Sequence, residues 1–150
     1  MNKLLSLAIE HHNLNNRYGF LSCLDYPKEY NRMSDLEALM MNECERLTAD
    51  NDMSVSGLYT VTNNLASDIV TGNIPETAKT TLYSRDEFID LLSQSMTRKE
   101  AERFKDMLEW MDDKDKKGYI ETRFILEFEN TRDHNKQYYY DWMDFVIVVE

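Results

Sequence analysis

The stretch "SDLEALMMNECERLT", residues 34–48, decides the fold class that the sequence predicts. Its apolar residues recur every three or four positions, which is the spacing of one face of an α-helix. They are Leu36, Leu39, Met40, Cys44 and Leu47. Ser34 and Glu37 have the spacing of a capping box, in which each side chain accepts a hydrogen bond from the backbone N–H of the other residue. The sequence therefore predicts a helix that begins at Ser34 and ends near Thr48.

The neighbouring segments carry further helical patterns. Upstream, apolar residues at helical spacing predict a helix over 3–14. The segment "NNRYGFLSCLDYPKEYNR" at 15–32 contains Gly19 and Pro27 and indicates an irregular connection. Downstream, residues 55–71 fit another helix. A strand is the alternative for this segment, because the run "GLYTVT" includes β-branched residues.

The second half of the chain contains two more capping boxes. "SRDE" at 84–87 and "TRKE" at 97–100 follow the linker "TGNIPETAKTT". They predict helices of about 85–94 and 98–112, and a further helix is expected at 122–131.

The C-terminal segment "YYYDWMDFVIVVE" is aromatic and β-branched, which suits a strand. The chain as a whole is short enough for one domain and long enough to bury a core. We therefore expect residues 1–150 to form a single, mainly α domain. It should hold five or six helices and a minor β element.

Composition limits the classes of partner. The net charge is −11 and the sequence pI is about 4.7, so direct binding to nucleic acid or to an anionic membrane is disfavoured. No segment approaches the roughly 18 apolar residues of a membrane span, and no signal-peptide pattern is present. Cys23 and Cys44 match neither a disulfide framework nor a zinc site. We expect a cytoplasmic protein in which Cys44 is a buried, reduced thiol.

A calcium-loop pattern lies in "WMDDKDKKGYIETRF", residues 110–124. With Asp113 at position 1 of a twelve-residue loop, Asp115 takes position 3, Gly118 the sharp turn at position 6 and Ile120 position 8. Together with the helices expected on both sides, this segment resembles the EF-hand family. The resemblance makes Asp113 and Asp115 the candidate metal ligands.

The same loop departs from the EF-hand pattern at two ligand positions. Lys117 stands at position 5, and Phe124 replaces the bidentate glutamate of position 12. An upstream loop at 76–87 has the complementary defect, since Glu87 fits position 12 while Ala78 fills position 3. Neither loop has a complete set of ligands. We therefore expect a degenerate helix–loop–helix pair, no metal site and no cofactor.

Catalytic signals are absent from the sequence. There is no nucleophile elbow, phosphate loop, zinc motif or HExxH helix. The adjacent histidines His11 and His12 point about 100° apart on a helix and cannot easily share a metal. Glu43 falls inside the predicted apolar stripe, so it should be paired, exposed at the edge of the stripe or protonated. No catalytic residue is predicted, although an unrecognised enzyme stays an alternative.

An acidic ridge is the strongest surface signal. Glu102, Asp106, Glu109 and Asp113 follow the spacing i, i+4, i+7, i+11, so they share one face of the helix expected at 98–112. A row of carboxylates at this spacing resembles a row of phosphates. We expect these four residues to bind a partner, and we refer to them as the acidic ridge.

The expected function is that of a non-catalytic acidic protein that binds a basic surface of another protein. In its sharpest form it is an inhibitor that occupies the nucleic-acid-binding cleft of an enzyme. By size, charge and the lack of catalytic motifs, the chain resembles phage anti-restriction and anti-CRISPR proteins that mimic DNA. The alternatives are an EF-hand-like regulatory or structural adaptor and the unrecognised enzyme.

A calcium titration tests the adaptor alternative. We expect no saturable calcium binding below about 1 mM, because the loop at 113–124 lacks the glutamate that completes the ligand shell. Isothermal titration calorimetry is the measurement. Micromolar binding that disappears in Asp113→Ala would contradict this expectation.

Overall fold

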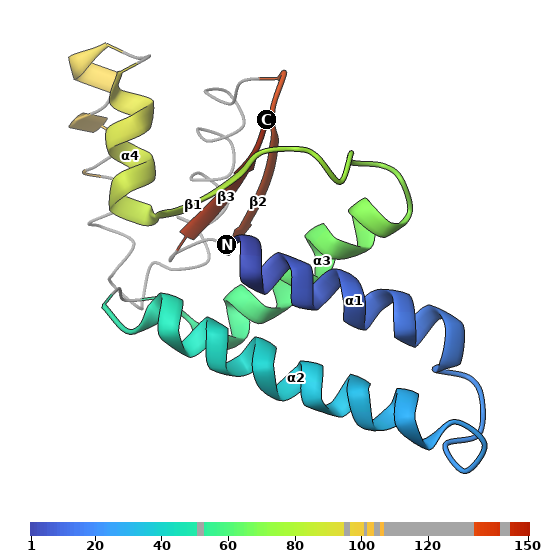
Figure 1. Cartoon of the computed structure of the whole chain (residues 1–150). Coiled ribbons are helices and arrows are strands. Elements are labelled where there is room, and N and C mark those ends of the chain that lie inside the picture. The colour runs from blue at the N-terminus through green and yellow to red at the C-terminus, as the bar shows by residue number, and fades with distance from the viewer. Residues whose placement is uncertain (51–52, 95–96, 101, 104–105, 107–133, 142–144) are drawn as a thin grey trace, which may run out of the picture.

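The computed structural model describes residues 1–50, 53–94, 97–100, 102–103, 106, 134–141 and 145–150. It is mainly α with a small β-sheet, as the sequence predicts (Figure 1). The helices are α1 (Asn2–Tyr18), α2 (Pro27–Thr48), α3 (Val55–Val70) and α4 (Arg85–Ser93). The strands are β1 (Thr80–Ser84), β2 (Gln137–Asp141) and β3 (Phe145–Val149).

The three strands form an antiparallel sheet in the order β1-β3-β2. Leu82 of β1 and Tyr139 of β2 both pair with Ile147 of β3. The C-terminal strand predicted from the sequence is therefore the central strand of the sheet. The aromatic segment just before it supplies β2.

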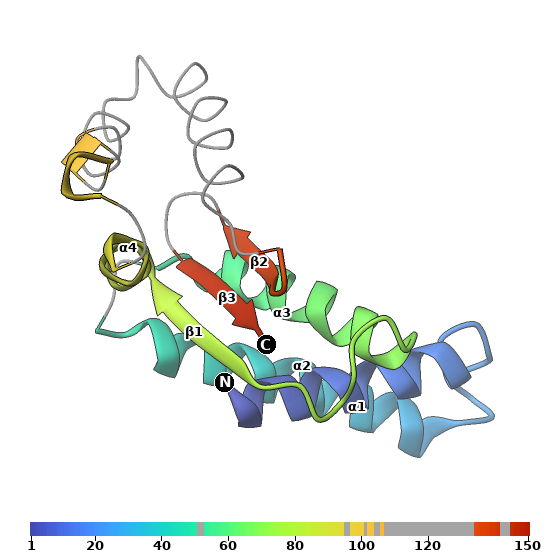
Figure 2. The ribbon, with the colours of Figure 1, turned by 90° about the horizontal axis from the view of Figure 1, so that it is seen from above.

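The sheet packs on the layer formed by α1, α2 and α3 (Figure 2). Because side chains alternate along a strand, every second residue of β3 faces these helices. Phe145, Ile147 and Val149 belong to the same buried cluster as residues of all three helices. This cluster is the main core. It includes Leu4 and Leu65, both fully buried.

The opposite face of the sheet is covered by α4 and by aromatic side chains. Val146 and Val148 of β3 are buried on this side, as is Phe88 of α4. The Phe88 ring contacts those of Tyr83 and Tyr138, with centroids 6.4 and 6.1 Å apart. The central strand is thus buried on both faces.

The α1–α2 hairpin differs from the sequence prediction. The irregular connection expected at 15–32 is present but shorter, at 19–26, since α1 continues to Tyr18 and α2 begins at Pro27. Proline suits the first turn of a helix, because the N–H that it lacks has no partner there anyway. The capping box predicted at 34–37 is wrong, because these residues lie inside α2. Glu37 instead contacts His11 of α1.

The predicted inner face of α2 is largely confirmed. Leu36, Met40 and Cys44 are fully buried and Leu47 is half-buried. The prediction that Leu39 faces inward is wrong, since 40% of its surface is exposed. Leu39 lies at one edge of the apolar stripe, beyond the positions on which α1 and α3 pack.

Of the helix and the strand considered for residues 55–71, the structure has the helix, α3. The linker expected at 71–81 ends earlier, because Thr80 and Thr81 belong to β1. The predicted loop at 76–87 therefore contains a five-residue strand. Its partner loop at 113–124 lies outside the described residues, so the EF-hand-like pair stays a prediction.

Both later capping boxes have the predicted geometry. The Ser84 N–H donates to Glu87 at 3.2 Å, and the Glu87 N–H donates to the Ser84 hydroxyl at 3.3 Å. Thr97 and Glu100 repeat this exchange at 3.2 and 3.3 Å. Residues 98–100 are helical, as predicted. The helix expected at 122–131 lies outside the described residues.

One buried hydroxyl provides a test of the main core. Thr62 of α3 is fully buried, and its hydroxyl finds no hydrogen-bond partner in the described part of the chain. An unpaired buried hydroxyl carries a desolvation cost. Thr62→Val should therefore raise the free energy of unfolding, by about 1 kcal/mol in urea denaturation.

Thr48→Val is the matched control, because Thr48 is buried and donates to the Cys44 carbonyl at 2.8 Å. This change deletes a hydrogen bond, so we expect it to lower stability by about 1 kcal/mol. Equal destabilisation by both substitutions would contradict the unpaired state of Thr62.

Candidate functional site

The structure places half of the predicted acidic ridge. Glu102 and Asp106 are helical and exposed, downstream of the capping box at 97–100. Glu109 and Asp113 lie outside the described residues, as does the metal candidate Asp115. The ridge therefore stays a prediction, with its first two members on the surface.

Glu102 has a neighbouring cation. Arg98 Nε donates to Glu102 Oε1 at 3.1 Å, and the two side chains are 93% and 64% exposed. An ion pair so open to water contributes little free energy and is readily exchanged. The Glu102 carboxylate thus stays accessible to a partner.

A groove of about 620 Å³ lies between β1 and the helix layer. The start of α1, the end of α2, β1 and α4 all contribute to its lining. The lining residues are Met1, Asn2, Lys3, Glu43, Arg46, Leu47, Met53, Thr80, Thr81, Leu82 and Glu87. We call it the β1 groove. It joins apolar side chains, charged side chains and the backbone of a strand.

Glu43 lies in the wall of the β1 groove and is only 3% exposed. Arg46 Nε donates to both of its carboxylate oxygens at 3.1 Å, and the Lys3 ammonium lies 3.7 Å away. The Arg46 hydrogen bonds lower the pKa of Glu43, against the opposing effect of its burial. Of the three states expected from the sequence, the paired one is observed. A carboxylate held ionised in this way is a poor proton donor at neutral pH.

The loop between α1 and α2 exposes a group of apolar side chains. Phe20 is 97% exposed, Leu24 88% and Leu21 45%. We call this loop, residues 19–26, the hairpin tip. Single exposed apolar residues are common on protein surfaces, but a contiguous group of them often marks an interaction site.

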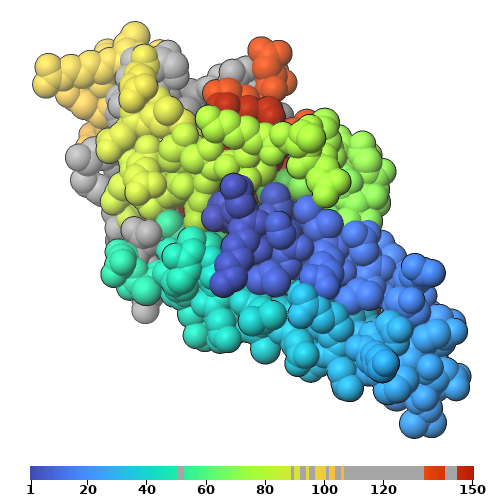
Figure 3. Space-filling view, in the orientation of Figure 1, coloured from blue at the N-terminus to red at the C-terminus, as the bar shows by residue number. Residues whose placement is uncertain are grey.

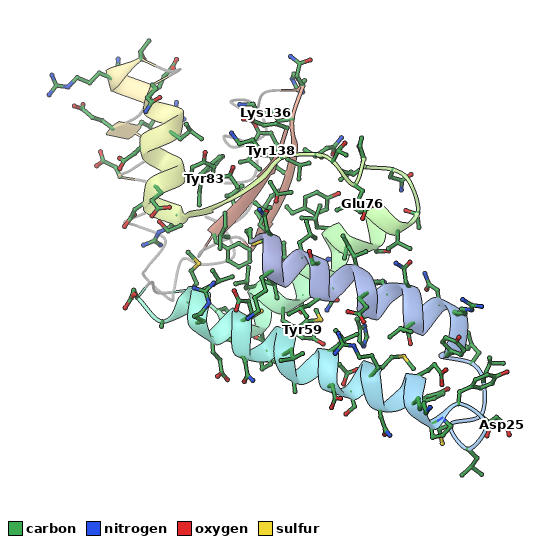
Figure 4. The ribbon with its side chains drawn as sticks, viewed as in Figure 1. Asp25, Tyr59, Glu76, Tyr83, Lys136 and Tyr138 are labelled. Atoms are coloured by element: carbon green, nitrogen blue, oxygen red, sulfur yellow. The ribbon has the colours of Figure 1, made fainter. Side chains whose placement is uncertain are left out.

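Hydrogen bonds and ring contacts hold the shape of the hairpin tip. The Tyr30 hydroxyl lies within hydrogen-bond reach of the carbonyls of Tyr18, at 2.8 Å, and of Leu21. The rings of Tyr18 and Tyr26 are in contact, with centroids 5.2 Å apart. In Figure 4 the labelled Asp25 marks the tip, at the far end of the molecule from Tyr83 of β1. The exposed apolar side chains are therefore presented on an ordered loop.

The histidines and cysteines have structural surroundings. His11 Nε2 lies 3.1 Å from Glu37, and His12 Nε2 lies 3.0 Å from the Asn63 carbonyl, so they connect α1 to α2 and to α3. Cys44 is a buried free thiol, as predicted, and burial raises its pKa to about 11. Cys23 is a free thiol in the exposed hairpin tip.

Sequence reasoning missed both the β1 groove and the hairpin tip. The sequence does contain a signal for the hairpin tip, since Phe20, Leu21 and Leu24 are apolar residues in a segment predicted to be irregular. The sequence contains no such signal for the β1 groove, because the residues that line it come from segments far apart in the chain. A third feature was also missed. The Tyr139 hydroxyl donates to Asp68, which ties β2 to α3, and burial raises the pKa of this tyrosine.

No known protein family, curated protein or solved structure matches this chain significantly. Among the described residues, no three histidine, cysteine or acidic side chains are grouped so that they can hold a metal ion. Within the same residues, no helix combines the length and the apolar composition needed to cross a lipid bilayer.

The ion pairs of Glu43 predict a pH-dependent effect on stability. Glu43→Gln should lower the free energy of unfolding by about 1–2 kcal/mol at pH 7, because a charge-assisted hydrogen bond is lost. The folded-state pKa of Glu43 is below its ordinary value of 4.5. Its contribution is therefore complete above that value and is lost as the pH falls through the folded-state pKa.

Urea denaturation at several pH values measures this effect. Glu45→Gln is the matched control, because Glu45 is an exposed carboxylate on the same helix. The stability difference between wild type and Glu43→Gln should shrink below about pH 4.5. A difference that is constant from pH 7 to pH 3 would contradict the ionised pair.

Proposed function

We propose that this chain is a non-catalytic acidic protein that binds a basic surface of another protein. In its sharpest form, it inhibits a nucleic-acid enzyme by occupying the cleft that binds nucleic acid. The acidic ridge supplies the charges that stand in for phosphates. The hairpin tip supplies apolar contact area elsewhere on the surface.

The ordered hairpin tip is the observation that best supports protein binding. Phe20 and Leu24 are almost fully exposed, although neighbouring hydrogen bonds and ring contacts fix the loop that carries them. Such side chains gain free energy when a partner covers them, since apolar area leaves water. Aromatic residues are also enriched among the side chains that contribute most to protein interfaces.

The charge of the chain supports a basic partner. A net charge of −11 attracts positively charged surfaces and repels nucleic acid. Glu102 and Asp106 are exposed where the sequence places the start of the ridge. Charges at the rim of an interface chiefly speed association and select the partner, while buried contacts set the lifetime of the complex. The ridge and the hairpin tip therefore have separable effects.

Affinity capture from the native host's lysate identifies the partner, and ridge variants then test the mechanism. Reversing Glu102, Asp106, Glu109 and Asp113 to lysine should reduce the association rate by about tenfold or more. Added salt should slow association of the wild type, because salt screens exposed charges. A DNA duplex should compete for the captured partner. Surface plasmon resonance measures each of these effects.

A control variant separates the ridge from overall charge. Reversing Asp35, Glu45, Asp50 and Glu76 to lysine makes the same change in net charge at exposed positions outside both the ridge and the hairpin tip. Circular dichroism confirms the fold of both variants. An association rate that falls equally in both, or in neither, would sink the ridge as a phosphate mimic.

A further inference from the structure

The β1 groove runs along a strand edge that the sheet does not use. The Glu150 N–H donates to the Lys79 carbonyl at 2.9 Å, one step beyond the paired residues of β1 and β3. In an antiparallel ladder, hydrogen-bonded pairs alternate with non-bonded pairs. Thr81 and Tyr83 therefore direct their backbone groups toward β3.

The remaining residues of β1 direct their backbone groups outward. These are Thr80, Leu82 and Ser84. The Ser84 N–H is taken by Glu87, as described above. In the described part of the chain, no strand pairs with the N–H and C=O groups of Thr80 and Leu82. Both residues line the β1 groove.

The strand itself lacks two of the devices that protect sheet edges. Its sequence, "TTLYS" at 80–84, holds neither a charged residue nor a proline. In the space-filling view, β1 runs across the surface between the N-terminal residues and α4 (Figure 3). Its outward backbone groups are therefore in a position to bond a further strand.

The helix layer forms a wall opposite this edge. Lys3 and Arg46 flank Glu43 in the wall, with Leu47 and Met53 beside them. A wall of this kind hinders the approach of a second folded sheet, but it admits a single extended chain. An extended residue occupies roughly 160 Å³, from its rise, the strand spacing and the sheet spacing. The groove, of about 620 Å³, therefore has room for a short extended segment.

Charge and apolar lining define the side chains that fit. Lys3 and Arg46 lie on either side of the buried Glu43, and their side chains are 71% and 65% exposed. The Glu87 carboxylate also lines the groove, where it accepts the Ser84 N–H. Lys3 and Arg46 keep hydrogen-bonding capacity for an acidic side chain. Leu47, Met53 and Leu82 suit an apolar side chain. Residues two apart in a strand point to the same face, so both side chains can meet the groove at once.

We propose that the β1 groove binds an extended segment of a partner protein, which adds to β1 as a further strand. This segment carries an acidic side chain two residues from an apolar one. Main-chain hydrogen bonds to Thr80 and Leu82 supply affinity, and the groove selects the side chains. The β1 groove contains no residue of the acidic ridge, so a test of this proposal does not depend on the proposed function.

A random heptapeptide library displayed on phage, selected against the full chain, supplies the probe. The most enriched peptide is then synthesised in two N-methylated forms, methylated at odd or at even positions. An added strand presents alternate N–H groups to β1, so one form should lose binding by roughly tenfold or more while the other keeps it. Enriched peptides should place Asp or Glu two positions from an apolar residue.

Variants of the chain locate the binding edge. Thr80→Pro removes an outward N–H at the first residue of the strand, where proline is tolerated, and should weaken binding of the peptide several-fold. Glu76→Pro, at the second position of the exposed Pro75–Ala78 turn, where proline is favoured, is the matched control and should leave binding unchanged. Lys3→Gln should cost roughly two- to fivefold in affinity.

Three outcomes overturn the proposal. They are a selection that enriches no peptide, equal binding by the two N-methylated forms, and full binding by a folded Thr80→Pro variant. If Thr80→Pro does not fold, as judged by circular dichroism, the pair of N-methylated peptides decides the question on the unaltered chain.

Discussion

Burial of β3 on both faces is the constraint on which the rest of the structure depends. None of its five residues is more than 7% exposed. Phe145, Ile147 and Val149 complete the core with three helices, while Val146 and Val148 face Phe88 and its aromatic neighbours. Each such side chain contributes about 1.5–3 kcal/mol when it leaves water. The strand therefore couples the helix layer, the outer strands and α4.

This central position of β3 also explains where binding surfaces can arise. In the order β1-β3-β2, the two outer strands each keep one edge that β3 does not pair. The β1 edge lies beside the groove, where the ion-paired Glu43 holds Lys3 and Arg46 in the wall. At the other end of the molecule, the hairpin tip exposes Phe20 and Leu24. The fold thus offers backbone, charged and apolar surfaces at separate places.

Local chemistry explains what could be predicted from the sequence. The capping boxes at Ser84 and Thr97 depend on residues three positions apart, and both are present. The box at Ser34 has the same letters but lies inside a helix that starts at Pro27, because packing against α1 extends α2. Strand β1 was missed because its partner, β3, lies more than sixty positions away. The β1 groove, assembled from equally distant segments, has no local signature, and the ridge stays a prediction.

Native-state hydrogen exchange, resolved for each amide of β1, tests this account most directly. If β3 pairs with one edge of β1 and leaves the other open, the Thr81 and Tyr83 amides should be protected. The amides of Thr80 and Leu82 should exchange orders of magnitude faster, because their N–H groups point into the groove. Equal protection of all four amides would contradict the account, since it would mean that the edge of β1 is already covered.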